Sequence, residues 1–163
     1  MRKYFLIIQL LQSASKIFIR EVILRYLGID WGISHLGLSI SDPNEKFVFP
    51  IGSITRTRWE EDLAKIRQII KEKDVGAIVL GNPLRTDVVS ASPKSIQRVK
   101  RKLESLGVDV ILFDERYSSK EALKIQEILG KKDKSKVHEI ASSIILKSFL
   151  EHKANTKKTV NDS

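Results

Sequence analysis

The sequence predicts an α/β fold, with a five-stranded mixed sheet and helices on both faces. Three short apolar segments, 22–29, 35–41 and 47–54, are separated by short turn-forming stretches. Connections this short join only antiparallel neighbours, so these segments are expected to form a three-stranded meander. Helical and strand patterns alternate after the meander, which adds two parallel strands to the sheet.

The first helix is expected directly after the meander. Thr57 and Glu60 have the spacing of a capping box, with Thr57 as the N-cap residue. Apolar residues then recur at helical spacing. The segment 77–80 is an apolar run typical of a buried strand, and Gly81 closes it.

A second helix leads to the fifth strand. Ser92 and Pro93 are typical of an N-cap and a first helical residue. The apolar stripe of this helix ends at Gly107, which predicts the stop. The strand 108–113 follows and ends in two acids.

Two helices complete the predicted elements. Ser118 and Glu121 form a second capping box, which opens a helix that Gly130 ends. A lysine-rich loop comes next, and the last helix runs from about residue 137 to 150. The polar tail, 153–163, is expected to be disordered.

One domain is expected, over residues 22–152. The segment 1–21 is either an additional amphipathic helix or a translated leader upstream of a true start. Its apolar run is shorter than the roughly 20 residues that span a bilayer. The protein is therefore expected to be cytoplasmic and to have no membrane partner. Separately, it is expected to be a monomer or a homodimer.

The composition favours an anionic partner. The chain has 29 basic and 20 acidic residues, a net charge of +9, and nucleic acid is the first candidate for such an excess. The alternative is a merely basic soluble protein. Because there is no cysteine, disulfides and thiolate metal sites are excluded, and oxygen or imidazole ligands favour Mg²⁺ or Mn²⁺.

Carboxylates stand at the ends of two predicted strands. Asp30 ends the first strand, and Asp114 and Glu115 end the last. If these strand ends lie close together, the acids repel one another unless one is protonated or a cation binds. Divalent ions at such clusters commonly act on phosphodiesters. The alternative is that the later acids pair with Arg116 or cap the next helix.

Four motifs in order resemble the YqgF (RuvX) family of Holliday-junction-resolvase-like proteins. They are the stretches 26–32 and 37–43, the Gly-Asn-Pro-Leu loop at 81–84 with Asp87, the Asp-Glu-Arg block at 114–116, and the lysine loop with the helix at 140–146. The resemblance covers about 22–150. It implies a ribonuclease H-like fold and a nuclease of the 5′ end of pre-16S rRNA or of Holliday junctions.

The resemblance also implies roles for individual residues. Asp30 and Glu115 would be the metal-binding catalytic acids, with Asp114 as a helper. The family usually carries a third acid where this chain has His138. Either His138 takes that position as a ligand or base, or Glu139 reaches in from a rotated helix, or the site is impaired.

The environment of His138 favours the first alternative. Ala141 and Ser142 lie one turn further along and are small, so the helix can approach the sheet there. An equally open alternative is a surface histidine near a helix start. A neutral imidazole offsets less divalent charge than a carboxylate, so weaker metal binding is expected.

Basic residues flank the predicted site. Lys131, Lys132, Lys134 and Lys136 precede the last helix, and Arg116 follows the acids. They are expected to contact the phosphate backbone of pre-rRNA or branched DNA. The cations at 98–102 are interpreted as a solvated helix face instead.

Two other functions remain open at this point. A catalytically degenerate nucleic-acid-binding protein of the same fold would bind but not cleave. An actin-like or sugar-kinase-like ATPase is suggested by the stretch 28–32. The chain is too short for the two lobes of such an ATPase and has no second glycine-rich phosphate loop.

Overall fold

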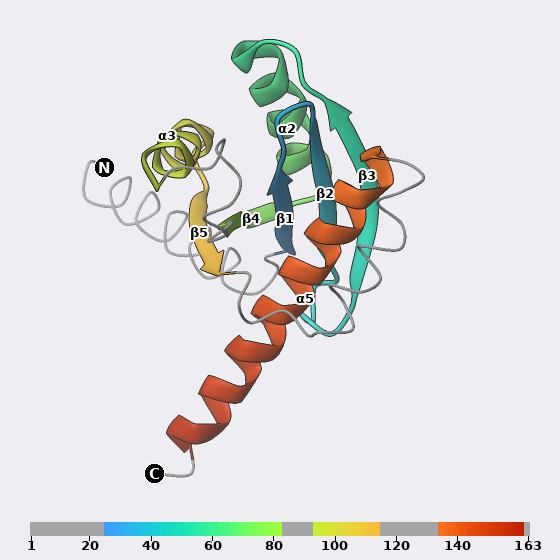
Figure 1. Cartoon of the computed structure of the whole chain (residues 1–163). Coiled ribbons are helices and arrows are strands. Elements are labelled where there is room, and N and C mark those ends of the chain that lie inside the picture. The colour runs from blue at the N-terminus through green and yellow to red at the C-terminus, as the bar shows by residue number, and fades with distance from the viewer. Residues whose placement is uncertain (1–24, 83–92, 115–133, 162–163) are drawn as a thin grey trace, which may run out of the picture.

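The computed structural model describes residues 25–82, 93–114 and 134–161, and these form a five-stranded sheet flanked by helices (Figure 1). The strands lie in the order β3-β2-β1-β4-β5. The described elements are, in chain order, β1 (Arg25–Trp31), β2 (His35–Ser41), β3 (Val48–Thr55), α2 (Trp59–Glu72), β4 (Val75–Asn82), α3 (Pro93–Glu104), β5 (Asp109–Asp114) and α5 (Lys134–Asn161). The predicted mixed sheet is confirmed.

The central strand is β1, which has one neighbour of each direction. It pairs antiparallel with β2 and parallel with β4, and β2 pairs antiparallel with β3, as the meander predicted. The strand β5 pairs only with β4 in this order. The two acid-ended strands, β1 and β5, are therefore separated by β4 rather than adjacent.

Large aliphatic side chains line one face of the sheet. They come from alternate positions of the strands and pack with α2 and α3, which both lie on this face (Figure 1). The helices contribute Ile66 of α2 and Ile96, Val99 and Leu103 of α3. The strand residues of this cluster include Leu27, Ile29, Leu36, Leu38, Ile40, Ile78 and Leu80.

The opposite face carries α5 and is lined by small residues. Gly28, Gly37, Ser39 and Ser41 occupy the alternate positions of β1 and β2, and all are buried. A side chain at Gly28 would lie 2.8 Å from Leu146 Cβ and 2.9 Å from the Ser142 carbonyl oxygen of α5. The small residues therefore let α5 pack directly on the sheet backbone.

The first helix does not begin as a capping box. Arg58, not Thr57, is the N-cap of α2, and no side chain caps it. The Thr57 hydroxyl instead donates to Glu61, and its backbone N–H donates to the Asp62 carboxylate. The capping-box prediction was wrong because the carboxylate of the first helical turn reaches back to Thr57.

The last helix is longer than predicted. It runs from Lys134 to Asn161 and projects past the sheet (Figure 1), so most of the tail that was expected to be disordered is helical. Lys153 fastens this part, since its ammonium donates to Tyr26 Oη at 2.7 Å and to Glu45 Oε1 at 2.6 Å. Burial lowers the pKa of Lys153, but these two hydrogen bonds outweigh it and raise the pKa above its ordinary value.

Several predictions lie outside the described residues. They concern the segment 1–21, the loop at 83–92, and the helix between Ser118 and Gly130. The start of α3 at Pro93 and the turn at Gly107, with its positive φ of 84°, agree with the predicted helix ends. Within the described part of the chain, no helix is long and apolar enough to cross a membrane.

Candidate active site

The site forms where β1 ends and α5 begins. Asp30 is the sixth residue of β1, and His138 is in the second turn of α5. His138 Nδ1 lies 2.5 Å from Asp30 Oδ2. The Asp30 side chain keeps 17% of its surface exposed and the His138 side chain keeps 28%, so a metal ion or a phosphate can reach them.

The two groups are hydrogen-bonded to each other in a partly buried place. The hydrogen bond to Asp30 raises the pKa of His138 above its ordinary value, burial opposes this, and the negative charge of Asp30 adds to it. An imidazolium–carboxylate pair is therefore favoured when no other cation is bound. A cation on Asp30 would reverse this preference, because metal binding and protonation compete.

Two glycines allow His138 to come this close. Gly37 is paired with Asp30 across β1 and β2, and a Cβ at Gly37 would overlap the carbonyl group of His138. A Cβ at Gly32 would lie 2.7 Å from His138 Nε2. The start of α5 therefore rests on bare backbone, and the imidazole lies against the turn that follows Asp30.

A second histidine, His35, lies beside this pair. Its ring is nearly parallel to that of His138, with 6.4 Å between the ring centres. His35 could not be selected from the sequence, because the two histidines show no metal-binding spacing along the chain. The contact exists only because the first residue of β2 faces the start of α5.

His138 rather than Glu139 is the residue that the structure brings to Asp30. The two neighbours differ by about 100° around the helix axis. Ala141 and Ser142 are buried, as expected for a helix that approaches the sheet one turn further on. The expectation that His138 faces Asp30 is confirmed as geometry.

Asp114 lies farther away. It is the last residue of β5 and is paired with Asn82 of β4, so a whole strand separates β5 from β1. Phe113 packs with α5 residues, whereas Leu112 packs on the opposite face. Side chains alternate between the two faces along a strand. Asp114 therefore lies on the same face of the sheet as Leu112, and Asp30 lies on the other face.

The remaining predicted site residues are only partly described. Glu115, Arg116, Lys131 and Lys132 lie outside the described residues. Lys134 and Lys136 belong to the first turn of α5, not to a loop, and Lys136 is exposed. Among the residues that the structure describes, no three carboxylates or histidines gather into a metal-binding group.

Comparisons with known proteins identify the family of this chain. A family described as "RuvX: Holliday junction resolvase" matches residues 24–152. A Chlamydia caviae protein named "Putative pre-16S rRNA nuclease" is 39% identical over 134 residues, which cover 77% of this chain and 82% of that protein. A Thermus thermophilus protein of the same name is 30% identical over 131 residues, covering 78% and 97%.

A solved structure has a similar fold. It is Thermus thermophilus RuvC in complex with a Holliday junction substrate, with a TM-score of 0.54 and 19% identity over 77% of this chain and 92% of that one. At this identity the likeness concerns the fold alone. It confirms the expected ribonuclease H-like architecture.

Proposed function

Because the chain belongs to the RuvX family, we propose that it is a metal-dependent nuclease that hydrolyses phosphodiester bonds in structured nucleic acid. The observation that carries this proposal is the contact between Asp30 and His138. It places a carboxylate and an imidazole, both partly exposed, at the end of the central strand. The substrate we favour is pre-16S rRNA, which the names of the relatives state for them, and we propose that it is cut in its 5′ region. A four-way DNA junction is the other candidate.

Asp30 and Glu115 are proposed to hold Mg²⁺ or Mn²⁺, with Asp114 in support. The carboxylate oxygens of Asp30 fit a hard cation, and the chain has no thiolate that would favour a softer one. Phe113 packs with α5, and side chains alternate along a strand, so Asp114 lies on the other face of the sheet and is proposed only as a helper. Such an ion would supply an activated water and would stabilise the leaving oxygen.

His138 is proposed to orient Asp30 and to exchange a proton with the attacking water or the leaving group. Its Nδ1 is committed to Asp30, while its Nε2 lies toward Gly32. An imidazole adds no negative charge to the site. Metal affinity is therefore expected to be lower than in a site with a third carboxylate at this position.

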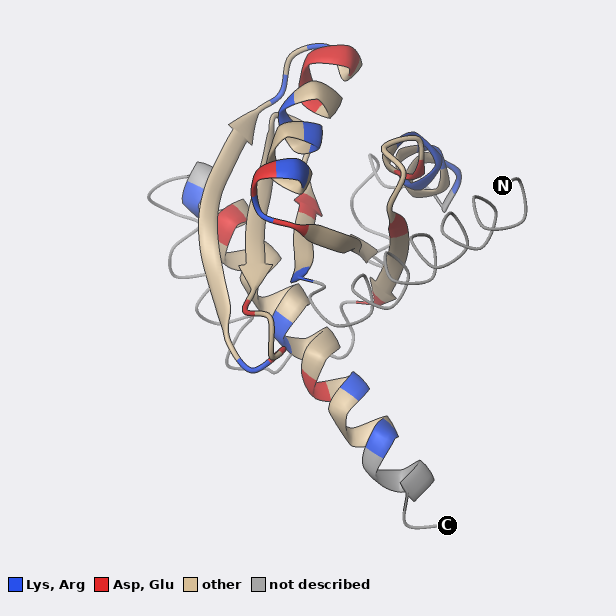
Figure 2. Ribbon diagram, turned by 180° about the vertical axis from the view of Figure 1, so that it is seen from behind, with Lys and Arg blue, Asp and Glu red and all other residues tan. Residues whose placement is uncertain are grey.

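Nucleic acid is proposed to lie along the start of α5. Lys136 is exposed two residues before His138, and Lys131, Lys132, Lys134 and Arg116 complete the basic set. Phosphate contacts of this kind give affinity that falls as salt rises. Lysine and arginine also gather on α3 (Figure 2), but this helix packs on the opposite face of the sheet from α5, and its cations at 98–102 remain interpreted as a solvated helix face.

One observation favours a second candidate, a nucleic-acid-binding protein without turnover. The imidazolium of His138 can neutralise Asp30 in place of a metal ion. In that case binding persists and cleavage is absent. The cleavage assay below separates the two candidates.

The test is cleavage of a labelled pre-16S rRNA leader and a labelled four-way junction with Mg²⁺ or Mn²⁺. We expect cleavage by the wild type and a loss of at least about 100-fold in Asp30→Asn, with binding retained. Asp109→Asn, an exposed carboxylate at the other end of β5, is the matched control and should keep full activity. Cleavage that survives Asp30→Asn contradicts the proposed site, and salt-dependent binding without cleavage supports the second candidate.

A further inference from the structure

The turn between β1 and β2, residues 32–34, lies directly beside the site, and its tip is exposed. Gly32 donates its N–H to the His35 carbonyl at 3.0 Å, which closes the turn. Ile33 at its tip is 71% exposed, and Ser34 is exposed as well. A turn of this kind needs an additional contact to stay fixed beside Asp30.

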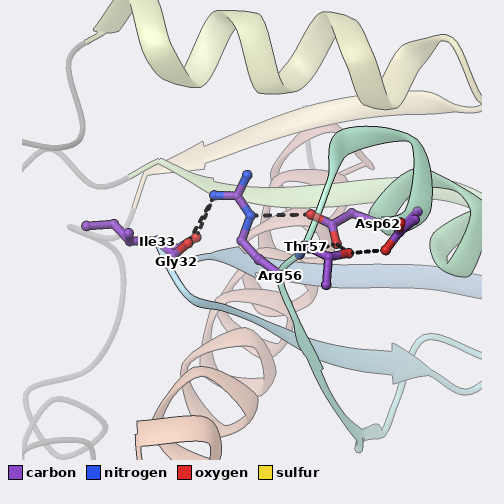
Figure 3. Close-up of polar contacts among 6 residues, drawn as sticks. Gly32, Ile33, Arg56, Thr57 and Asp62 are labelled. Carbon is purple, nitrogen blue, oxygen red and sulfur yellow. Dashed lines mark hydrogen bonds and ion pairs between the residues drawn. The ribbon is translucent and has the colours of Figure 1, made fainter.

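Arg56, just after β3, supplies that contact. Its Nη1 donates to the Gly32 carbonyl at 3.1 Å and to the Ile33 carbonyl at 3.4 Å, while its Nε donates to Asp62 Oδ2 at 3.5 Å (Figure 3). Its backbone N–H also donates to the Ser34 carbonyl at 2.9 Å. One residue therefore joins three consecutive carbonyls of the turn to the start of α2.

Asp62 fixes the guanidinium in turn. Its side chain is completely buried in the first turn of α2, where an unpaired carboxylate would be costly. It accepts from the Thr57 backbone N–H at 3.1 Å and from Arg56. The guanidinium is thus bound to a buried carboxylate of α2 and is not a mobile surface cation.

The guanidinium also lies close to two tryptophan rings. Arg56 Cζ lies 4.6 Å from the Trp31 ring centre and 5.4 Å from that of Trp59, and the two rings stack with 5.0 Å between their centres. Trp31 directly follows Asp30 in β1. A lysine cannot reproduce both the hydrogen bonds from Nη1 and Nε and the contacts of the guanidinium with the two rings.

Because Gly32 also lies against the His138 imidazole, Arg56 acts on both residues of the site. We propose that Arg56 is a positioning residue, which holds the β1–β2 turn so that Asp30 and His138 keep their contact. This inference rests on the proposed nuclease function for its catalytic consequence. Its structural part, the fixed turn, can be measured without turnover.

The test compares Arg56→Ala and Arg56→Lys with Arg58→Ala, which removes an exposed arginine two residues away. Misplacing catalytic groups can cost about 100-fold in rate. We expect kcat to fall at least about tenfold in both Arg56 variants, with KM changed less than about twofold, and no change in Arg58→Ala. Added guanidinium ion, at concentrations that leave the protein folded, should partly restore Arg56→Ala.

The Arg56→Lys variant distinguishes a positioning effect from a simple loss of folding, because it keeps a cation near Asp62. If a folded Arg56→Lys variant has wild-type kcat, the inference is wrong while the proposed function stands. Hydrogen exchange of the Gly32 amide and the NMR signals of the His138 ring test the fixed turn even if no substrate is cleaved. Faster exchange and shifted ring signals in the Arg56 variants alone support the inference, and values equal to those of Arg58→Ala overturn it.

Discussion

The two faces of the sheet are built from side chains of different size. The face toward α2 and α3 is filled by large aliphatic residues at alternate strand positions. The face toward α5 has glycine or serine at 28, 37, 39 and 41. The first face gains stability by burial of apolar area. The second face buries apolar area at β4 and β5 but gains close approach of a helix over β1 and β2.

The close approach is what forms the site. Asp30 and Gly37 are paired across β1 and β2, and the backbone of His138 lies directly over Gly37. A larger residue at 37 would hold α5 away from the sheet and separate the imidazole from the carboxylate. A larger residue on the α5 face is therefore expected to lower the free energy of unfolding more than a smaller residue on the face toward α2 and α3.

The largest effect is expected from one methyl group added to the α5 face. In Gly37→Ala the Cβ overlaps the His138 carbonyl group, and because this is backbone it cannot rotate away. We expect a loss of about 3 kcal/mol or more in the free energy of unfolding, measured by urea denaturation, and loss of cleavage. Gly52→Ala is the control, since φ is 112° there but no atom of the described residues lies within 4 Å of an added Cβ. It should cost only about 1 to 2 kcal/mol of backbone strain.

A medium effect is expected from one methyl group removed on the other face. Ile78 is fully buried and is paired with Leu27, away from the site. Ile78→Val should lower the free energy of unfolding by about 1 kcal/mol and leave kcat unchanged. A loss of activity comparable with that of Gly37→Ala would contradict the distinction between the faces.

The smallest effect is expected from a hydroxyl on the α5 face. Ser39 is fully buried, and within the described part of the chain its Oγ has no hydrogen-bond partner. Ser39→Ala should therefore be neutral or slightly stabilising. Ser41→Ala, its neighbour on the same face, removes the acceptor of the Tyr26 N–H at 2.9 Å and should cost about 1 kcal/mol. Equal effects of the two serine substitutions would contradict this account.

The fold was predictable where local signals decide it. Short turns between apolar segments fixed the meander, and helix and strand periods fixed β4, α3 and β5. The end of α5 was not predictable from polarity alone. The chain after residue 150 is polar, but it contains no glycine or proline up to 161, and the bonds of Lys153 to Tyr26 and Glu45 come from distant parts of the sequence.

The site was predictable in part. Asp30 followed from a carboxylate at a strand end, and small residues one turn after His138 indicated which side of the helix approaches the sheet. Arg56 and His35 gave no signal, because their roles depend on contacts between elements that lie 20 to more than 100 residues apart in the sequence. Glu115 and the lysines at 131 and 132 remain predictions.

The helix α5 makes the spacing of its residues as important as their identity. Ile145, Leu146 and Leu150 pack in the core, and they set the rotation of the whole helix. One residue inserted between His138 and Ala141 would turn the imidazole by about 100° relative to this core anchor. An acid or another ligand that takes the place of the imidazole beside Asp30 must therefore stand at position 138 itself.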